Sequence, residues 1–251
     1  IEKINLLKKY YNDIKNILVE TISKTHPDNP TKISESEYNN CAKFLTNFVD
    51  IYTTNYDLLL YWVKMKKDLD FKDCFWPNDN DTDNIFQFLN PKSKRFMFLH
   101  GALHLYSFES NVEKIVWNEY SLNGSLKKQI KEKIENNIFP LFVSDGSSIQ
   151  KLEKIKSNHY LYEVYDSLFN VKNLVTFGFS FSENDEHIYS KFKDMKQIEN
   201  IIIGIYPKID ENEFKRIENI CKALISETKQ KLGRENINLY FYDSTTAKVW
   251  R

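Results

Sequence analysis

A cluster of polar side chains stands where a predicted strand near residue 50 gives way to a predicted helix. Residues 48–53 are β-branched and aromatic, which is typical of a strand, and helical apolar spacing begins soon afterwards. Between the two lie Thr53, Thr54, Asn55 and Asp57. Ligands of open α/β sheets bind at such strand ends, and a helix start offers free N–H groups to an anion. The simpler alternative, that Asp57 or Thr54 only caps the helix, stays open.

A histidine follows the next predicted strand, residues 95–99. The pKa of a free histidine is about 6.5, so His100 is the natural candidate for an acid–base role. Gly101 permits a tight turn and close approach of a ligand to the backbone. The alternative is a buried histidine of the core. His104 would share a face with His100 only in a helix, and two histidines make a weak metal site, so we expect no metal.

Two further predicted strands end in small or polar residues. Residues 138–143 lead into Ser144, and residues 173–177 lead into Gly178 and Ser180. If the strands are parallel, all these ends lie along one edge of one sheet, where a nucleotide would bind. Asp185 is either an N-cap or first-turn acid of a helix, or a hydrogen-bonding partner of the loop that begins at Gly178.

The remaining pattern predicts an α/β protein. Strands of nearly continuous apolar character alternate with helices, which indicates a mostly parallel sheet with helices on both faces. Residues 1–47 form an N-terminal helical part, in which Ser34 and Glu37 have the spacing of a capping box. Residues 68–90 read as a long loop or small lobe. We expect one domain over residues 1–251.

Composition excludes some functional classes. Lys+Arg and Asp+Glu are both 35, so net charge gives no argument for binding nucleic acid or a membrane surface. No apolar run approaches the roughly 20 residues of a membrane span. The cysteines Cys41, Cys74 and Cys221 form no C-x-x-C, which favours a reducing cytoplasm over a disulfide framework or a cysteine zinc site.

Several of these motifs, in this order, resemble the sirtuin-like superfamily of NAD-dependent proteins and, more narrowly, a bacterial sirtuin-like family of unassigned function. The similarity covers residues 49–251. It is carried by Thr53-Thr54-Asn55-Tyr56-Asp57, Leu99-His100-Gly101-Ala102-Leu103-His104-Leu105, Val143-Ser144-Asp145-Gly146-Ser147, Gly178-Phe179-Ser180-Phe181-Ser182-Glu183-Asn184-Asp185-Glu186-His187-Ile188 and Val249-Trp250.

The resemblance implies a Rossmann-like sheet that holds NAD, and it implies roles for individual residues. Asn55 would contact the nicotinamide-side ribose, Asp57 would support that pocket, and His100 would be the base at the ribose hydroxyl. The loop of Gly178 and Ser180 would bind the adenosine side. Lesser contacts to NAD are implied for Thr53, Thr54, Gly101, Ser144 and Asp185.

Two departures from the superfamily narrow the expected function. The paired cysteines of the sirtuin zinc module are absent, which argues against protein deacylation. We therefore expect an NAD glycohydrolase, of the kind that depletes NAD in bacterial anti-phage defence. The glycine-rich first turn is also missing, and we expect it to precede Ile1.

Two other functions stay open. One is a sensor that binds NAD or ADP-ribose without cleaving it, and the other is a nucleic-acid-binding or helical interaction protein, which the neutral charge disfavours. As partners we expect NAD or ADP-ribose, with a homo-oligomer or a trigger protein left open, and no nucleic acid or membrane.

Overall fold

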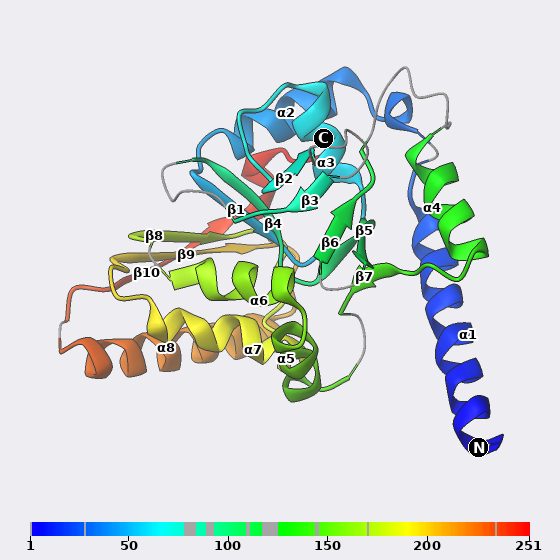
Figure 1. Ribbon diagram of the computed structural model, residues 1–251. Helices are drawn as coiled ribbons and strands as arrows, with labels where there is room; N and C mark the ends of the chain where they lie inside the picture. The colour runs from blue at the N-terminus through cyan, green and yellow to red at the C-terminus, as the bar shows by residue number, and fades with distance from the viewer. Residues whose placement is uncertain are drawn as a thin grey trace. The chain divides into compact units, whose positions relative to one another are not determined.

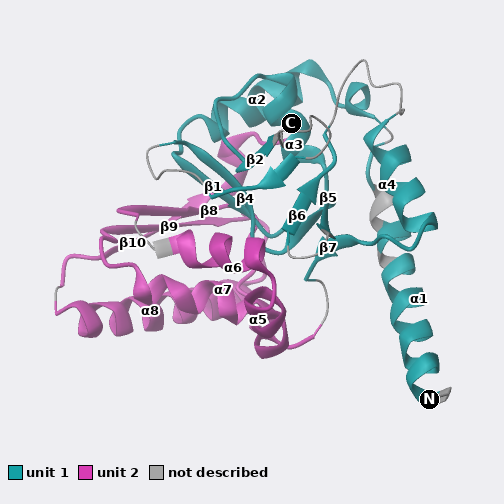
Figure 2. Ribbon diagram, viewed as in Figure 1, with its two compact units in different colours: residues 1–143 teal, residues 144–251 magenta. Residues whose placement is uncertain are grey.

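The structure is a computed structural model in which the chain divides into two compact units. It describes residues 2–27, 29–77, 84–88, 93–108, 111–116, 125–143, 146–169, 171–233 and 235–251. Unit 1 comprises residues 1–143 and unit 2 residues 144–251, as Figure 2 shows by colour. The expectation of a single domain stays a prediction.

Unit 1 begins with helices, as the sequence predicted. Its helical elements are α1 (Glu2–Thr25), the 3-10 turn η1 (Pro30–Lys32), α2 (Glu35–Leu45), α3 (Leu59–Lys66) and α4 (Leu126–Glu135) (Figure 1). The capping box is confirmed, because the Ser34 hydroxyl accepts the N–H of Glu37 and the Glu37 carboxylate accepts the N–H of Ser34.

Two short strands of unit 1, β1 and β4, form a parallel pair. Strand β1 (Asp50–Thr53) pairs with β4 (Arg95–Phe98), with Asp50 opposite Arg95 and Thr53 opposite Phe98. The Arg95 guanidinium donates two hydrogen bonds, of 2.9 and 2.6 Å, to the two carboxylate oxygens of Asp50. Because this bidentate pair joins opposing residues, it favours this register over a shifted one.

The second sheet of unit 1 is antiparallel, which corrects part of the prediction. Its order is β2-β3-β6-β5-β7, with β2 Phe75–Pro77, β3 Asn84–Phe86, β5 Gly101–Phe108, β6 Asn111–Lys114 and β7 Pro140–Phe142. The predicted strand at residues 138–143 therefore runs antiparallel to β5, outside a parallel sheet. Residues 68–90, predicted as a loop, contain β2 and β3. Short strands paired at long range leave little periodicity in the sequence.

Unit 2 contains a three-stranded parallel sheet in the order β10-β9-β8. The strands are β8 (Asn173–Thr176), close to the predicted strand at residues 173–177, β9 (Asn200–Ile205) and β10 (Asn238–Asp243). The helical elements are α5 (Ser148–Lys156), α6 (His159–Asp166), η2 (Ser167–Phe169), η3 (Glu183–Asp185), α7 (Glu186–Tyr189), η4 (Ser190–Asp194), α8 (Glu211–Leu232) and η5 (Ser244–Ala247).

Helix α8 links two parallel strands and packs on the sheet. Its buried residues recur at helical spacing on one face: Ile217, Cys221, Leu224, Ile225 and Thr228. Phe214 of α8 contacts Phe241 of β10, with ring centroids 5.3 Å apart. The Asp210 carboxylate caps the helix start and Gly233 ends the helix in a left-handed conformation.

The fold is thus mixed α/β, with several sheets that are parallel in part and antiparallel in part. The predicted parallel pairing is confirmed for β1–β4 and for β8, β9 and β10. Among the described helices, none combines the length and the apolar composition that a membrane span requires.

Gly101 gives a test of the turn between β4 and β5. It has φ +78°, and an added Cβ would lie 2.0 Å from the carbonyl oxygen of Leu141. We expect Gly101→Ala to lower the free energy of unfolding by about 3 kcal/mol, since left-handed strain and overpacking add. Gly233→Ala is the matched control, because it has φ +63° but open space around the added Cβ.

Gly233→Ala should cost only about 1 kcal/mol. Urea unfolding of both variants measures the difference. Equal losses would show that the approach of the Leu141 backbone does not constrain position 101.

Candidate functional site

In unit 1 the first two motifs follow neighbouring strand ends. The N–H of Leu99 donates to the carbonyl oxygen of Thr53 at 2.8 Å, which extends the β1–β4 pairing by one bond. Because the two strands are parallel, the residues after Thr53 and the residues after Leu99 leave the same edge of the pair. The structure therefore brings the turn of residues 53–57 close to His100.

Thr53 and Asn55 have different places in this turn. The buried Thr53 hydroxyl accepts the N–H of Asn55 at 3.0 Å and so holds the chain in a local turn. The Asn55 side chain is exposed, while Thr54 is half-buried. Thr53 thus stabilises the backbone of the turn. The exposed Asn55 amide can be reached by a ligand from solvent.

Tyr56 ties the turn to His100, a role that the sequence did not reveal. Its hydroxyl donates to the carbonyl oxygen of Val143 at 2.6 Å, and its carbonyl accepts the N–H of Leu103 at 2.9 Å. The Tyr56 and His100 rings lie nearly parallel, at 25° with centroids 6.3 Å apart. His100 is only 2% exposed, and its carbonyl accepts the N–H of Val143. The imidazole is therefore held in place by its surroundings.

Asp57 and His26 together satisfy the start of α3. The Asp57 carboxylate accepts the N–H of Leu59 at 2.8 Å, and His26 Nε2 accepts the N–H of Leu58 at 3.0 Å. His26 Nδ1–H donates to the carbonyl of Pro27, so the neutral tautomer is fixed. Burial raises the pKa of Asp57 and lowers the pKa of His26.

The bonds to the N–H groups of Leu58 and Leu59 bear on the two expectations for this turn, an anion site and a helix cap. The N–H groups of Leu58 and Leu59 are occupied, so they are not free to bind an anion. The N-cap position of α3 is Leu58, without a side-chain cap bond, so the simpler alternative that Asp57 or Thr54 only caps the helix is not confirmed. His26, which carried no signal in the sequence, was missed because its partner lies 32 residues away.

Gly101 approaches protein backbone, where the sequence had suggested a ligand. Its Cα lies against the carbonyl of Leu141, at the pairing of β5 with β7. This close contact explains why position 101 requires glycine.

His104 packs as a core residue of β5. It is completely buried, stacks on Tyr61 with centroids 4.6 Å apart, and meets the edge of Phe98. Within the described residues neither ring nitrogen has a hydrogen-bond partner. Burial, aided by the nearby charge of Lys114, lowers the pKa of His104 to about 3. The segment is a strand, so the helical geometry considered for His100 and His104 does not occur.

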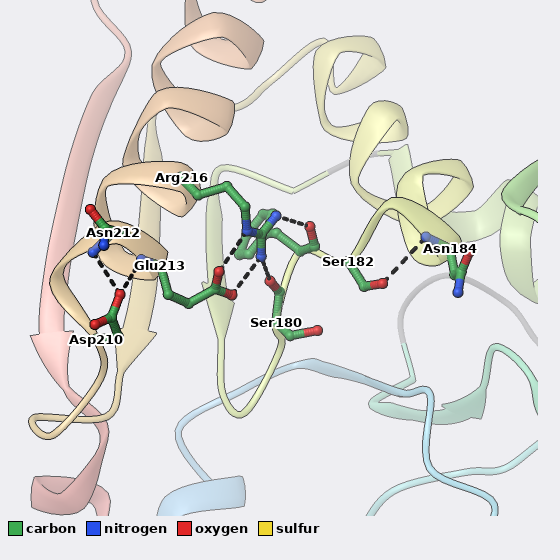
Figure 3. Close-up of polar contacts among 8 residues, drawn as sticks. Ser180, Ser182, Asn184, Asp210, Asn212, Glu213 and Arg216 are labelled. Carbon is green, nitrogen blue, oxygen red and sulfur yellow. Dashed lines mark hydrogen bonds and ion pairs between the residues drawn. The ribbon is translucent and has the colours of Figure 1, made fainter.

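In unit 2 an arginine of α8 holds the loop that follows β8. Arg216 donates to the carbonyl oxygens of Phe181 and Ser180, at 2.7 and 2.6 Å, and forms a bidentate pair with Glu213 (Figure 3). Gly178 is exposed with φ +65°, and an added Cβ would meet nothing within 4 Å. The Ser180 side chain is also exposed. The loop thus combines a fixed backbone with an open surface at both predicted positions.

Asp185 does not cap a helix with its side chain. Its carboxylate instead accepts a hydrogen bond from Lys151 at 2.8 Å, and the pair is largely buried. Asp185 does occupy the N-cap position of α7 and the first turn of η3, as predicted, but its side chain makes no cap hydrogen bond. The link to the loop is made by the backbone N–H of Asp185, which donates to the carbonyl of Ser182 at 2.8 Å.

The predicted site residues thus fall in both units. Thr53, Thr54, Asn55, Asp57, His100 and Gly101 belong to unit 1, and Gly178, Ser180 and Asp185 belong to unit 2. Ser144 lies outside the described residues. Sequence reasoning missed Tyr56, His26, Arg216 and Lys151, whose partners lie 32 to 87 residues away.

His104 predicts a measurable loss of stability in acid. The unfolded chain takes up a proton below pH 6.5, whereas folded His104 resists it down to about pH 3. The free energy of unfolding should therefore fall as pH drops through this window, by up to about 1.4 kcal/mol per pH unit from this residue. In His104→Phe and His104→Leu variants, urea unfolding between pH 4 and 6 should show a shallower slope. A slope equal to that of the wild type would refute a depressed pKa.

Arg216 predicts the mobility of the Gly178–Ser180 loop. Arg216→Lys keeps the charge but loses the planar fork that reaches both carbonyls. Amide hydrogen exchange of residues 179–182 should accelerate about tenfold, since a bond from a charged donor is worth about 1.5 kcal/mol or more. The control is Lys222→Gln, which breaks an exposed pair with Glu218 on the same helix. Similar exchange in both variants would mean that Arg216 does not hold the loop.

Comparison with known proteins assigns a family to almost the whole chain. A search of curated proteins finds no match. Residues 2–250 match the family model described as "Domain of unknown function (DUF4917)". The chain belongs to this family.

Proposed function

We propose that this protein binds NAD in a Rossmann-like, sirtuin-like arrangement and hydrolyses it to nicotinamide and ADP-ribose. The observation that carries the proposal is the parallel pairing of β1 with β4. This pairing puts the turn that contains Asn55 beside His100, at the edge where α/β sheets take their ligands.

The chemistry of these side chains suits cleavage at a ribose. Nicotinamide departs with the electrons of its bond to the sugar, which leaves an oxocarbenium-like carbon. Water adds to that carbon and releases one proton. We assign the role of base at a ribose hydroxyl to His100, and Asn55 would position the ribose and the water.

Asp57 would have a positioning role and would not touch the reacting atoms. Its carboxylate holds the start of α3, so it would support the turn of Asn55 and make no bond to NAD. Burial raises the pKa of this carboxyl group, and the backbone N–H of Leu59 opposes that rise.

Taken by itself, unit 2 has features that suit the binding of a nucleotide. The parallel sheet β8–β10, with α8 as a crossover between β9 and β10, is the kind of unit from which Rossmann-like domains are built. Gly178 has no side chain to keep a ligand away from its backbone, and the exposed Ser180 offers a hydroxyl group that can donate a hydrogen bond. Cleavage of NAD in a bacterium would deplete the cell of it, and we extend the proposal to such a role in anti-phage defence.

One observation favours a second candidate, a sensor that binds NAD or ADP-ribose and leaves it intact. His100 is 2% exposed, and a base that solvent and substrate cannot reach would not catalyse. Recovery of intact nucleotide after saturable binding in calorimetry would support this candidate over hydrolysis.

The test is NAD turnover by the full-length protein, with nicotinamide and ADP-ribose quantified by mass spectrometry. We expect His100→Ala and Asn55→Ala to lower the rate by about 100-fold or more, the usual contribution of an acid–base group. Matched controls are His159→Ala and Asn39→Ala, which remove exposed residues of the same types. Wild-type turnover in the His100 and Asn55 variants would exclude both residues from the mechanism.

A further inference from the structure

Unit 1 contains a cavity that the proposed NAD chemistry does not use. Its volume is about 400 Å³, within the usual range for small-molecule pockets. Its lining comes from the end of α3, the segment of residues 68–74, strands β2 and β3, and the end of β6. Neither His100 nor the turn of residues 53–57 belongs to it.

The buried charges of this cavity do not balance. Lys114 and Asp73 pair at 2.7 Å, with both side chains 8% exposed. The third charged group that is not exposed is Lys64, whose Nζ contacts Met65 Sδ at 3.9 Å. Within the described residues no carboxylate lies within ion-pair distance of this ammonium group. The three groups together therefore carry one net positive charge.

The remaining charges lie at the mouth of the cavity. Asp68 is exposed, and Lys72 pairs with Asp70 at 3.4 Å with 48% and 85% of their side chains exposed. Water and salt screen such groups, so they compensate poorly for a charge inside. Burial lowers the pKa of Lys64, and the charge of Asp73, which already pairs with Lys114, opposes this shift only in part.

Aromatic side chains form the apolar part of the wall. Tyr61, Phe75 and Trp76 all line the cavity. The Lys114 ammonium lies 5.7 Å from the centroid of Tyr61 and 5.4 Å from that of Phe75, so these faces already bind a cation on one side. The half-buried Trp76 offers a further flat surface against which a ring can pack.

The segment that lines the cavity is bracketed by strained backbone. Asp68 has φ 45° and Cys74 has φ 63°, a region that non-glycine residues adopt at a cost. Such strain is kept where the surrounding structure imposes it, and it is frequent at ligand sites.

We propose that this cavity binds a small aromatic monocarboxylate. The carboxylate would pair with the ammonium group of Lys64, and the ring would pack against Trp76. A single negative charge matches the single uncompensated positive charge inside, and a desolvated ion pair of this kind selects strongly against a neutral analogue.

The test is calorimetric titration of the full-length protein with indole-3-carboxylate and with its neutral counterpart, indole-3-carboxamide. We expect the carboxylate to bind at least about tenfold more tightly than the amide. Lys64→Gln should weaken carboxylate binding by about tenfold or more and leave amide binding unchanged. The control is Lys66→Gln, which removes an exposed lysine from the same turn of α3 and should bind the carboxylate as the wild type does.

Three results would overturn the proposal: no carboxylate binding to the wild type at millimolar concentration, equal affinity for acid and amide, or equal losses in the two lysine variants. NAD turnover of the Lys64 variant, measured in parallel, keeps this test separate from that of the proposed function. Unchanged turnover with lost carboxylate binding is the expected pair of results.

Discussion

The parallel pairing of β1 with β4 is the constraint on which the candidate site in unit 1 depends. Two short strands of four residues each make few backbone hydrogen bonds, so their register needs further support. The bidentate pair of Asp50 and Arg95 supplies it at one end, and the bond from Leu99 to Thr53 continues it at the other. A shift by one residue would break the Asp50–Arg95 pair and move the two polar motifs apart along the strands.

His100 is fixed because the chain reverses immediately after it. The residue lies between β4, which is parallel to β1, and β5, which is antiparallel to β7. Gly101 permits this reversal through its positive φ and its contact with the backbone of Leu141. Val143 then joins the arrangement through His100 and Tyr56. The same backbone contacts that build the sheet therefore position the imidazole.

The sequence was most informative where local chemistry decides the structure. The capping box of α2 and the apolar strand β8 both depend on residues close to one another in the chain. The sequence predicted that the candidate site lies at the ends of strands, but it did not predict the hydrogen bonds that hold the site together. Tyr56, His26 and Arg216 were missed because each acts on a group far away in the sequence, which periodicity and spacing do not encode.

The five-stranded sheet was missed for a related reason. Residues 101–106 are buried throughout, so β5 lacks the alternation of apolar and polar residues that marks a half-buried strand. His104 is part of that pattern, since it packs on Tyr61 as an aromatic ring would. The burial of this ring explains why the pKa of His104 lies far below its usual range.

The most direct measurement is a crystal structure of the full-length protein with ADP-ribose bound. The account predicts a ribose within hydrogen-bonding distance of the Asn55 amide and the His100 imidazole. ADP-ribose bound elsewhere, or a His100 ring still enclosed and out of reach of the sugar, would contradict it.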